Sequence, residues 1–347
     1  MRNKTGVITG KFAPLHSGHV YAITQASTKC DHLYVILSHD QEWVDSLGAG
    51  LSDKLSYKKK LLWLKTTFKD LDHITVIGLD ETDIQPYPKG VEQWCTKVNK
   101  IFNSLGKSID VWFSSEPEYD WWINKYFNCE HEIIDAERSM FNISATKVRE
   151  NPYMYWSMLP TIVRKEWLKK VVIIGTESSA KSTLTKYLAK RFNTSWVEEY
   201  GRTYCEDNMC GDEGLLTFED YGIIASERYH QEKEAESGAN KLLICDTNAF
   251  VTQFYCNLYE GRDNHLVDTY IQQEKYDLVL HLSDEVKWVD DGLRINQDRG
   301  KTSKLFEEML EKYKVKDHNN YHYITGDYNQ RLEKAFAIVN NLFKEGT

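Results

Sequence analysis

Short apolar runs alternate with helical stretches along this sequence, and this alternation constrains the fold more than any other feature. In the helical stretches apolar residues recur every three or four positions, as in residues 56–68. Strands joined by crossovers of helix length form right-handed βαβ units, so we predict an α/β protein with two doubly wound parallel sheets. The expected strands are 6–9, 33–38, 74–79, 111–114 and 132–134 in the first half and 171–174, 194–197, 242–245, 278–282 and 321–325 in the second.

The length and one aromatic segment indicate two domains. A chain of 347 residues is long enough for two domains of ordinary size. Residues 151–160 are rich in aromatic side chains, contain two prolines and separate the two series of strands and helices. We place the junction near residues 160–168 and predict domains at 1–165 and 166–347.

The composition excludes several classes of ligand and indicates a cellular compartment. The 52 acidic and 43 basic residues give a net charge of −9, which disfavours general affinity for nucleic acid, so particular loops must hold any anionic ligand. The sequence contains no apolar run near the roughly 18 residues of a membrane span and no secretory signal. Its seven cysteines form no CxxC pair, which argues against disulfides and zinc. We expect a cytoplasmic protein without nucleic-acid or membrane partners; a homo-oligomer stays open.

The second half opens with a P-loop pattern. It lies between the apolar run 171–174 and the helical stretch 184–192, which is the setting a phosphate-binding loop requires. Lys181 would contact the β- and γ-phosphates of ATP, and the Ser182 hydroxyl would bind Mg²⁺. Ala180 replaces the usual second glycine, so the loop must fit a Cβ close to the phosphates. The expected binding residues are Gly175, Ser179, Ala180, Lys181, Ser182 and Thr183.

Two further elements of the second half suit phosphoryl transfer. Asp246 ends the apolar run 242–245, where a second Mg²⁺ ligand is expected; a carboxylate that caps the next turn is the alternative. Arg294, in the segment 290–294, is placed to neutralise the transferred phosphoryl group.

The first half opens with a histidine-rich turn. Gly10 allows close backbone approach, and Gly18 lets His16 and His19 converge where the next helix begins. Such a turn can donate hydrogen bonds to an attacked α-phosphate without a covalent nucleophile. A chance pair of histidines is the alternative.

A second phosphate clamp is expected at residues 142–149. Ser144 and Thr146 can cap a helix there, and Arg149 can face phosphates across the carboxyl edge of the sheet. Taken alone, this segment is a plain helix cap.

These motifs carry a family resemblance. Residues 10–19 and 143–149 resemble the nicotinamide-nucleotide adenylyltransferases, and the whole chain resembles the bifunctional NadR family, which joins that activity to a ribosylnicotinamide kinase. The likeness extends to the segments 86–90, 113–117, 199–202 and 288–294. It implies a Rossmann-like nucleotidylyltransferase followed by a P-loop kinase. The implied reactions are phosphorylation of nicotinamide riboside to nicotinamide mononucleotide (NMN) and joining of NMN to AMP, which yields NAD and pyrophosphate, each with Mg²⁺ and ATP.

The resemblance also implies particular contacts. His16 and His19 would contact ATP phosphates, and an aromatic ring in residues 79–94 would stack on the pyridinium, although Trp94 equally suits core packing. The residues implied for the first half are Thr9, Gly10, Lys11, Phe12, Asp83, Tyr87 and Trp94. Those implied near the riboside and the transferred phosphoryl group are Glu198, Tyr200, Arg202, Asp290, Asp291 and Arg294.

Other interpretations stay open. Longer relatives carry an N-terminal helix-turn-helix domain, and because this chain begins five residues before its first expected strand, we expect no operator binding. A different nucleotidylyltransferase fused to another small-molecule kinase shares the same motifs. A regulatory sensor that binds NAD or ATP with one or both activities residual is the alternative from another class, and Ala180 is the feature that favours it.

Overall fold

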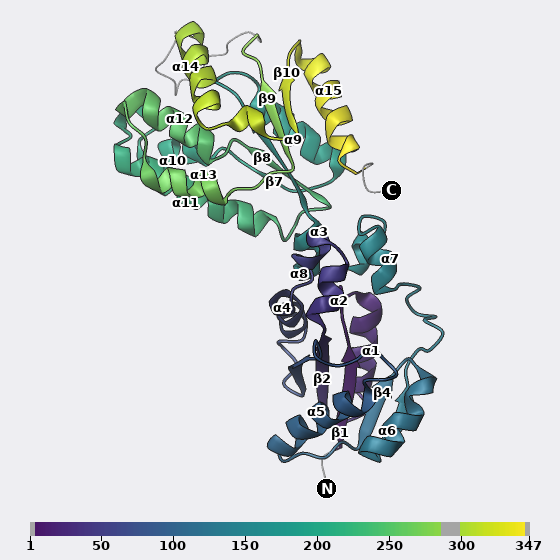
Figure 1. Cartoon of the computed structure of the whole chain (residues 1–347). Helices are drawn as coiled ribbons and strands as arrows, with labels where there is room; N and C mark the ends of the chain where they lie inside the picture. The colour runs from purple at the N-terminus through teal and green to yellow at the C-terminus, as the bar shows by residue number, and fades with distance from the viewer. Residues whose placement is uncertain (1–3, 286–298, 344–347) are drawn as a thin grey trace. The chain divides into compact units, whose positions relative to one another are not determined.

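The computed structural model describes residues 4–285 and 299–343 and divides the chain into two compact units. Unit 1 comprises Met1–Glu166 and unit 2 comprises Trp167–Thr347. Each unit contains a five-stranded, fully parallel sheet with helices on both faces (Figure 1). The predicted fold class is therefore confirmed. Within the described residues, no helix has the length and apolar character needed to cross a membrane.

Unit 1 has the strand order β3-β2-β1-β4-β5. Its strands are β1 (Thr5–Gly10), β2 (His32–His39), β3 (Ile74–Asp80), β4 (Val111–Ser114) and β5 (Glu130–Ile133). The order reverses beside β1, where neighbouring connections leave on opposite faces and open a crevice at the carboxyl edge. The loop that follows β1 therefore lies where ligands bind in this kind of sheet.

The helices of unit 1 cover both faces because alternate strand residues point to opposite sides. Val7 and Trp112 pack with Val98 and Phe102 of α5 in one buried cluster. The helices are α1 (Ser17–Ser27), α2 (Gln41–Ser46), α3 (Ala49–Ser52), α4 (Tyr57–Thr67), α5 (Val91–Ser104), α6 (Asp120–Phe127), α7 (Ala145–Glu150) and α8 (Thr161–Arg164).

Unit 2 has the strand order β10-β9-β6-β8-β7. Its strands are β6 (Lys169–Ile174), β7 (Trp196–Val197), β8 (Leu242–Asp246), β9 (Leu278–Leu282) and β10 (Tyr321–Ile324). Val171 and Ile173 of β6 belong to one core cluster, and Val172 and Ile174 belong to the other. The loop that follows β6 opens between β8 and β9, which places it at the centre of the carboxyl edge.

The helices of unit 2 divide between the two core clusters. Leu188 of α9 and Val339 of α15 pack in the first, whereas Phe254 of α12 and Phe306 of α14 pack in the second. The helices are α9 (Lys181–Phe192), α10 (Tyr200–Asn208), α11 (Phe218–Ala235), α12 (Ala249–Glu260), α13 (His265–Gln273), α14 (Arg299–Lys312) and α15 (Tyr328–Asn341).

Candidate active sites in the two units

The turn between β1 and α1 brings the two predicted histidines together. His16 caps α1, and its Nδ1 accepts a hydrogen bond from the His19 backbone N–H at 3.4 Å. The two imidazoles stack with centroids 3.6 Å apart and an angle of 19° between their planes. Because Nδ1 of His16 accepts, its neutral ring carries the proton on Nε2. A Cβ on Gly18 would lie 3.2 Å from the His16 ring, so glycine allows this approach.

Both imidazoles are neutral near pH 7. Burial and the positive charge of Arg138 together lower the pKa of His16 to about 4. Burial, His16 and Arg138 hold the pKa of His19 well below its usual value. Nδ1 of His19 is buried and has no hydrogen-bond partner in the described part of the chain. An unsatisfied ring nitrogen beside a second neutral imidazole suits hydrogen bonding to a ligand.

The predicted second clamp contacts this turn directly. Arg149 on α7 donates a hydrogen bond to the Ala13 carbonyl at 2.7 Å and another to Thr146 Oγ1 at 3.0 Å. Ser144 caps α7, since its hydroxyl accepts from the Lys147 N–H at 3.2 Å. The two segments, more than a hundred residues apart in sequence, therefore form one site.

Trp43 lies between the two positive charges of this site. Lys11 Nζ is 4.4 Å from the Trp43 ring centroid, and Arg149 is 5.4 Å from it. Lys11 also forms an ion pair with Glu81 at 3.7 Å. Trp43 and Glu81 were not singled out as site residues in the sequence analysis, although both lie shortly after predicted strands.

A cavity of about 500 Å³ adjoins the turn, within the range of roughly 300–1,000 Å³ usual for small-molecule sites. Three carboxylates contribute to its wall, those of Asp40, Glu42 and Glu81. The aromatic residues that line it are Trp43, Tyr87, Trp94, Tyr119 and Trp122. Thr9, Gly10 and Lys11 line it as well.

Three residues implied for this pocket differ from the others in placement or contacts. The Asp83 side chain is 76% exposed, pairs with Lys97 and does not line the cavity. Trp94 packs edge-to-face on Trp112, so it contributes to the core. It also lines the cavity, where a ring could stack on it. Phe12 is buried in the turn with a φ of 43° and does not line the cavity.

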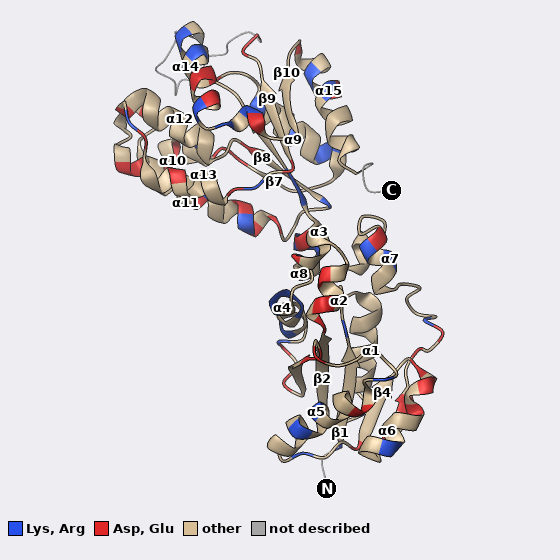
Figure 2. Cartoon of the chain, in the orientation of Figure 1, with Lys and Arg blue, Asp and Glu red and all other residues tan. Residues whose placement is uncertain are grey.

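A buried lysine supports the turn from α4, a helix rich in lysine (Figure 2). Lys60 is fully buried, and its Nζ donates a hydrogen bond to the Lys11 carbonyl at 3.2 Å. Burial and the nearby Lys11 lower its pKa to about 8. Lys60 was not expected from the sequence, because a lysine in a helical pattern is usually solvated.

The predicted P-loop joins β6 to α9. Gly175 has a φ of 148°, and a Cβ there would lie 2.8 Å from the Leu282 carbonyl oxygen, so glycine is required. Lys181 Nζ donates to the Thr176 carbonyl at 3.0 Å, and Ser179 Oγ donates to the same oxygen at 2.8 Å. Ala180 adopts a φ of 71°, so this alanine takes the left-handed conformation that glycine favours.

Asp246, at the end of β8, lies beside the P-loop as predicted. Its side chain is buried, and Oδ1 has no hydrogen-bond partner in the described residues. Burial and the nearby Glu199 raise its pKa to about 6, against the opposing effects of Lys181 and a hydrogen bond with Ser182. A buried carboxylate oxygen without a partner beside a hydroxyl is the kind of donor set that Mg²⁺ takes, so these residues fit that ion.

A narrower pocket of about 70 Å³ adjoins Lys181. Glu177, Glu199 and Arg202 give it charged groups, and Tyr200, Tyr221, Tyr255 and Tyr259 give it aromatic ones. Glu199 belongs to the segment 198–202 implied near the riboside, although it was not singled out, and it lines this pocket. The implied Glu198 instead pairs with Lys186 at 3.1 Å, with its side chain 56% exposed.

Five other predicted residues do not contribute to the pocket as described. Ser182 and Thr183 are exposed at the start of α9 and do not line the narrow pocket. Asp290, Asp291 and Arg294 lie outside the described residues.

The two parallel sheets, each with a predicted phosphate-binding turn beside a pocket, have the architecture of a nucleotide-transferring enzyme. Two curated relatives, each named "Trifunctional NAD biosynthesis/regulator protein NadR", come from Escherichia coli K12 and Salmonella typhimurium LT2. Each is 34% identical to this chain over 98% of its length and 83% of the relative's length. The chain belongs to the NadR family.

Solved structures show the same fold over nearly the whole chain. A crystal structure of NadR in complex with NR has a TM-score of 0.80 at 24% identity and covers 98% of this chain and 96% of that one. A second, of NadR with NAD and AMP-PNP, has a TM-score of 0.78 at 24% identity, with coverage of 99% and 96%. A family model described as an AAA domain matches residues 170–331.

Proposed function

We propose that this chain is a bifunctional enzyme of NAD biosynthesis and salvage. Unit 2 transfers the γ-phosphate of ATP to the 5′-hydroxyl of nicotinamide riboside, and unit 1 joins the resulting NMN to AMP from a second ATP. The observation that carries the proposal is that each unit has its own phosphate-binding junction at the edge of its own pocket. The NadR structures with NR and with NAD and AMP-PNP are consistent with these ligands.

In unit 2 the riboside hydroxyl attacks the γ-phosphorus. A new oxygen–phosphorus bond forms, the bond to the bridging oxygen of ADP breaks, and ADP leaves. Lys181 neutralises charge on the transferred group. Glu199, which lines the pocket beside Lys181, orients the hydroxyl and accepts its proton, which then passes to water.

The metal role falls to Ser182 and Asp246. When bound, Mg²⁺ supplies positive charge that stabilises the β- and γ-phosphate oxygens during transfer. The unpartnered Oδ1 of Asp246 and the Ser182 hydroxyl would hold it. This division leaves Glu199 available for the substrate hydroxyl.

In unit 1 a phosphate oxygen of NMN attacks the α-phosphorus of ATP. The bond from that phosphorus to the pyrophosphate breaks, and no proton transfer is required. Neutral N–H groups of His16 and His19 donate to the phosphate oxygens, while Lys11 and Arg149 balance the charge that develops. Positioning and electrostatics therefore account for catalysis without a covalent intermediate.

The large pocket of unit 1 suits a pyridinium nucleotide. The ring of NMN is positively charged, and aromatic faces and carboxylates attract such a cation. Trp43, Tyr87 and Trp94 supply the faces, and Asp40 and Glu81 supply negative charge. This combination favours a cationic base over a neutral one.

The test separates the two activities. Purified protein with Mg²⁺ and ATP is expected to convert nicotinamide riboside and, separately, NMN to NAD. Lys181→Ala should abolish use of the riboside and leave use of NMN within about twofold, because the substitution removes phosphate stabilisation in unit 2 alone. NAD, ADP and pyrophosphate are measured by chromatography. If the wild-type protein makes NAD from neither substrate, or if the variant still uses the riboside, the proposal is wrong.

A further inference from the structure

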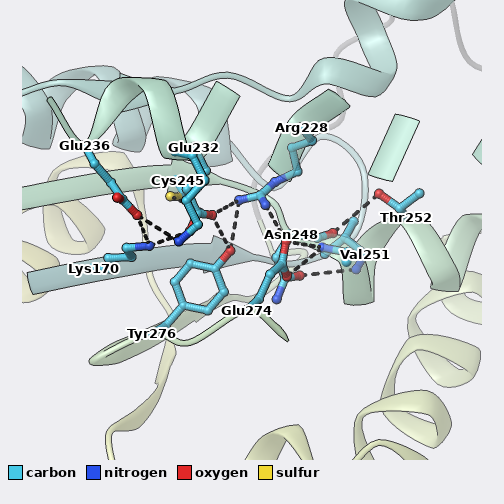
Figure 3. A network of polar contacts seen from close by, with 12 residues as sticks. Lys170, Arg228, Glu232, Glu236, Cys245, Asn248, Val251, Thr252, Glu274 and Tyr276 are labelled. Atoms are coloured by element: carbon cyan, nitrogen blue, oxygen red, sulfur yellow. Dashed lines mark hydrogen bonds and ion pairs between the residues drawn. The ribbon is translucent and has the colours of Figure 1, made fainter. Parts of the chain in front are cut away.

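A buried ionic network in unit 2 contacts the start of α12, next to Asn248 (Figure 3). The side chains of Arg228 on α11 and Glu274 after α13 are 1% and 2% exposed. Two charges held this far from water require close partners, because an unpaired buried charge is costly. The members of the network are Lys170, Arg228, Glu232, Glu236, Cys245, Glu274 and Tyr276.

Glu274 connects the network to the backbone of α12. Its Oε1 accepts from Arg228 Nη1 at 2.5 Å, and the Ala249 N–H donates to both oxygens, at 3.0 Å to Oε2 and 3.3 Å to Oε1. Ala249 is the first residue of α12, where backbone N–H groups lack partners within the helix and the helix dipole favours a negative charge. Glu274 therefore clamps the start of α12 to Arg228.

The clamped segment is the turn from β8 into α12. Thr247 has a φ of 65°, which is unfavourable for a β-branched residue and persists only when neighbours fix it. Its N–H donates to the Ile173 carbonyl at 3.0 Å, and Asn248 caps α12. Asp246 immediately precedes this turn, so the turn determines where that carboxylate points.

The same segment forms a wall of the substrate pocket. Thr247, Val251 and Thr252 line the narrow pocket, and Arg228 lines it as well. A displacement at the start of α12 would move this wall and the Asp246 carboxylate together. Misplacement of a catalytic group by about 1 Å can reduce a rate about a hundredfold.

We propose that Glu274, held by Arg228, is a positioning residue for phosphoryl transfer, because it fixes the turn that places Asp246 and the pocket wall. The proposal rests on the kinase activity proposed above for unit 2. It assigns a role in the reaction to a carboxylate that does not line the pocket.

Glu232 provides a matched control. It is equally buried and pairs with Arg228 Nη2 at 3.0 Å, so its loss removes the same charge from the same guanidinium. Within the described contacts, Glu232 bonds to no backbone atom of residues 246–249; it accepts from Cys245 Sγ, a contact that glutamine preserves. Glu232→Gln therefore perturbs the network without breaking the clamp.

The experiment compares Glu274→Gln with Glu232→Gln in the full chain. Glutamine at 274 cannot accept at both oxygens, so we expect the kcat for riboside phosphorylation to fall at least about tenfold, with the KM for ATP within about twofold. Glu232→Gln should keep kcat within about threefold. The unchanged KM for ATP shows that unit 2 is folded, and adenylyl transfer by unit 1 in the same preparation gives the amount of active protein. Equal losses in the two variants, or an unchanged kcat in a folded Glu274→Gln protein, would overturn the proposal.

A second variant breaks the clamp from the backbone side. Ala249→Pro removes the N–H while keeping every charge, and proline is well tolerated at the first position of a helix. It should reduce kcat as Glu274→Gln does; a kcat equal to that of the wild type would contradict the clamp.

Hydrogen exchange tests the clamp without relying on the substrate. Amides of residues 249–252 should exchange faster in Glu274→Gln than in Glu232→Gln, and equal rates would contradict the clamp. If the wild-type protein phosphorylates no riboside, the proposed kinase function fails, and this comparison still decides whether Glu274 fixes the turn.

Discussion

His16 performs two separable tasks in unit 1. Its backbone position and Nδ1 cap α1, whereas its ring stacks on His19, and the proposed adenylyl transfer assigns Nε2 to a phosphate oxygen. The sequence predicted that the two rings converge. It could not reveal that burial keeps both rings neutral, because burial depends on segments distant in sequence, including Arg138.

The two tasks separate in His16→Asn. Asparagine is among the preferred capping residues, so the free energy of unfolding should change by less than about 1 kcal/mol. Adenylyl transfer should fall by about 10²–10³, the usual cost of removing one donor to a developing oxyanion. The measurements are denaturant unfolding and pyrophosphate release from NMN and ATP. A stability loss with little loss of activity would indicate a structural role alone.

Because Lys60 is buried, the free energy of unfolding should depend on pH in a specific way. The pKa of Lys60 is lowered from 10.5 to about 8 in the folded state, so the folded protein binds this proton less tightly than the unfolded chain does. Below about pH 8 the buried charge therefore costs stability, at most about 3 kcal/mol, and this cost disappears as the pH rises toward 10.5.

Lys60→Met should consequently be more stable than the wild-type protein at pH 7, and the difference should shrink between pH 8 and 10.5. Denaturant unfolding of both proteins across this range measures the difference directly. A difference that does not vary with pH would show that Lys60 has the same pKa in the folded and unfolded states, which would contradict this account.

The sequence analysis could not predict which single residue after a strand lines a pocket. It identified the segment after β7 but selected Glu198, whereas the adjacent Glu199 lines the pocket. It likewise included Asp83 after β3, although Glu81 lines the cavity. Side chains near a strand end point in alternating directions, and the sequence does not fix the residue at which the alternation stops.

At the scale of elements, the strands and the turns that join them to the next helices were predictable because local pattern determines them. The ten expected strands correspond to those found, with differences at their ends. β7 contains only Trp196–Val197. Thr194 pairs with the β8 side through its side chain instead, because its hydroxyl donates to the Leu242 carbonyl and accepts from the Asn240 N–H. The short helices α2 and α3 were not predicted, since four to six residues are too few for a periodic signal.

The backbone geometry of the P-loop leads to opposite predictions for substitutions at Gly175 and Ala180. Gly175→Ala should destabilise unit 2 by more than about 2 kcal/mol and abolish protection by Mg²⁺ and ATP, because its Cβ would clash with the Leu282 carbonyl. Ala180→Gly should change stability by less than about 1 kcal/mol and retain protection, since relief of left-handed strain offsets the entropy that glycine costs. Thermal unfolding with and without Mg²⁺ and ATP measures both. Tolerance of Gly175→Ala would contradict the geometry described for the loop.

At the scale of the whole molecule, the family and the two-sheet architecture were predictable because the motifs extend over nearly the whole chain. The predicted junction near residues 160–168 includes the observed division at Glu166. The pockets were less predictable, because their walls combine residues from loops far apart in sequence. Thr9 and Trp122, more than a hundred residues apart, both line the cavity of unit 1.

The central claim is that each unit uses its own ATP, one as a phosphoryl donor and the other as an adenylyl donor. The most direct test is the yield of products per NAD formed by the wild-type protein. From nicotinamide riboside we predict one ADP and one pyrophosphate for each NAD; from NMN we predict one pyrophosphate and no ADP. Release of ADP during NAD synthesis from NMN, or NAD formed from either substrate without pyrophosphate, would contradict the account.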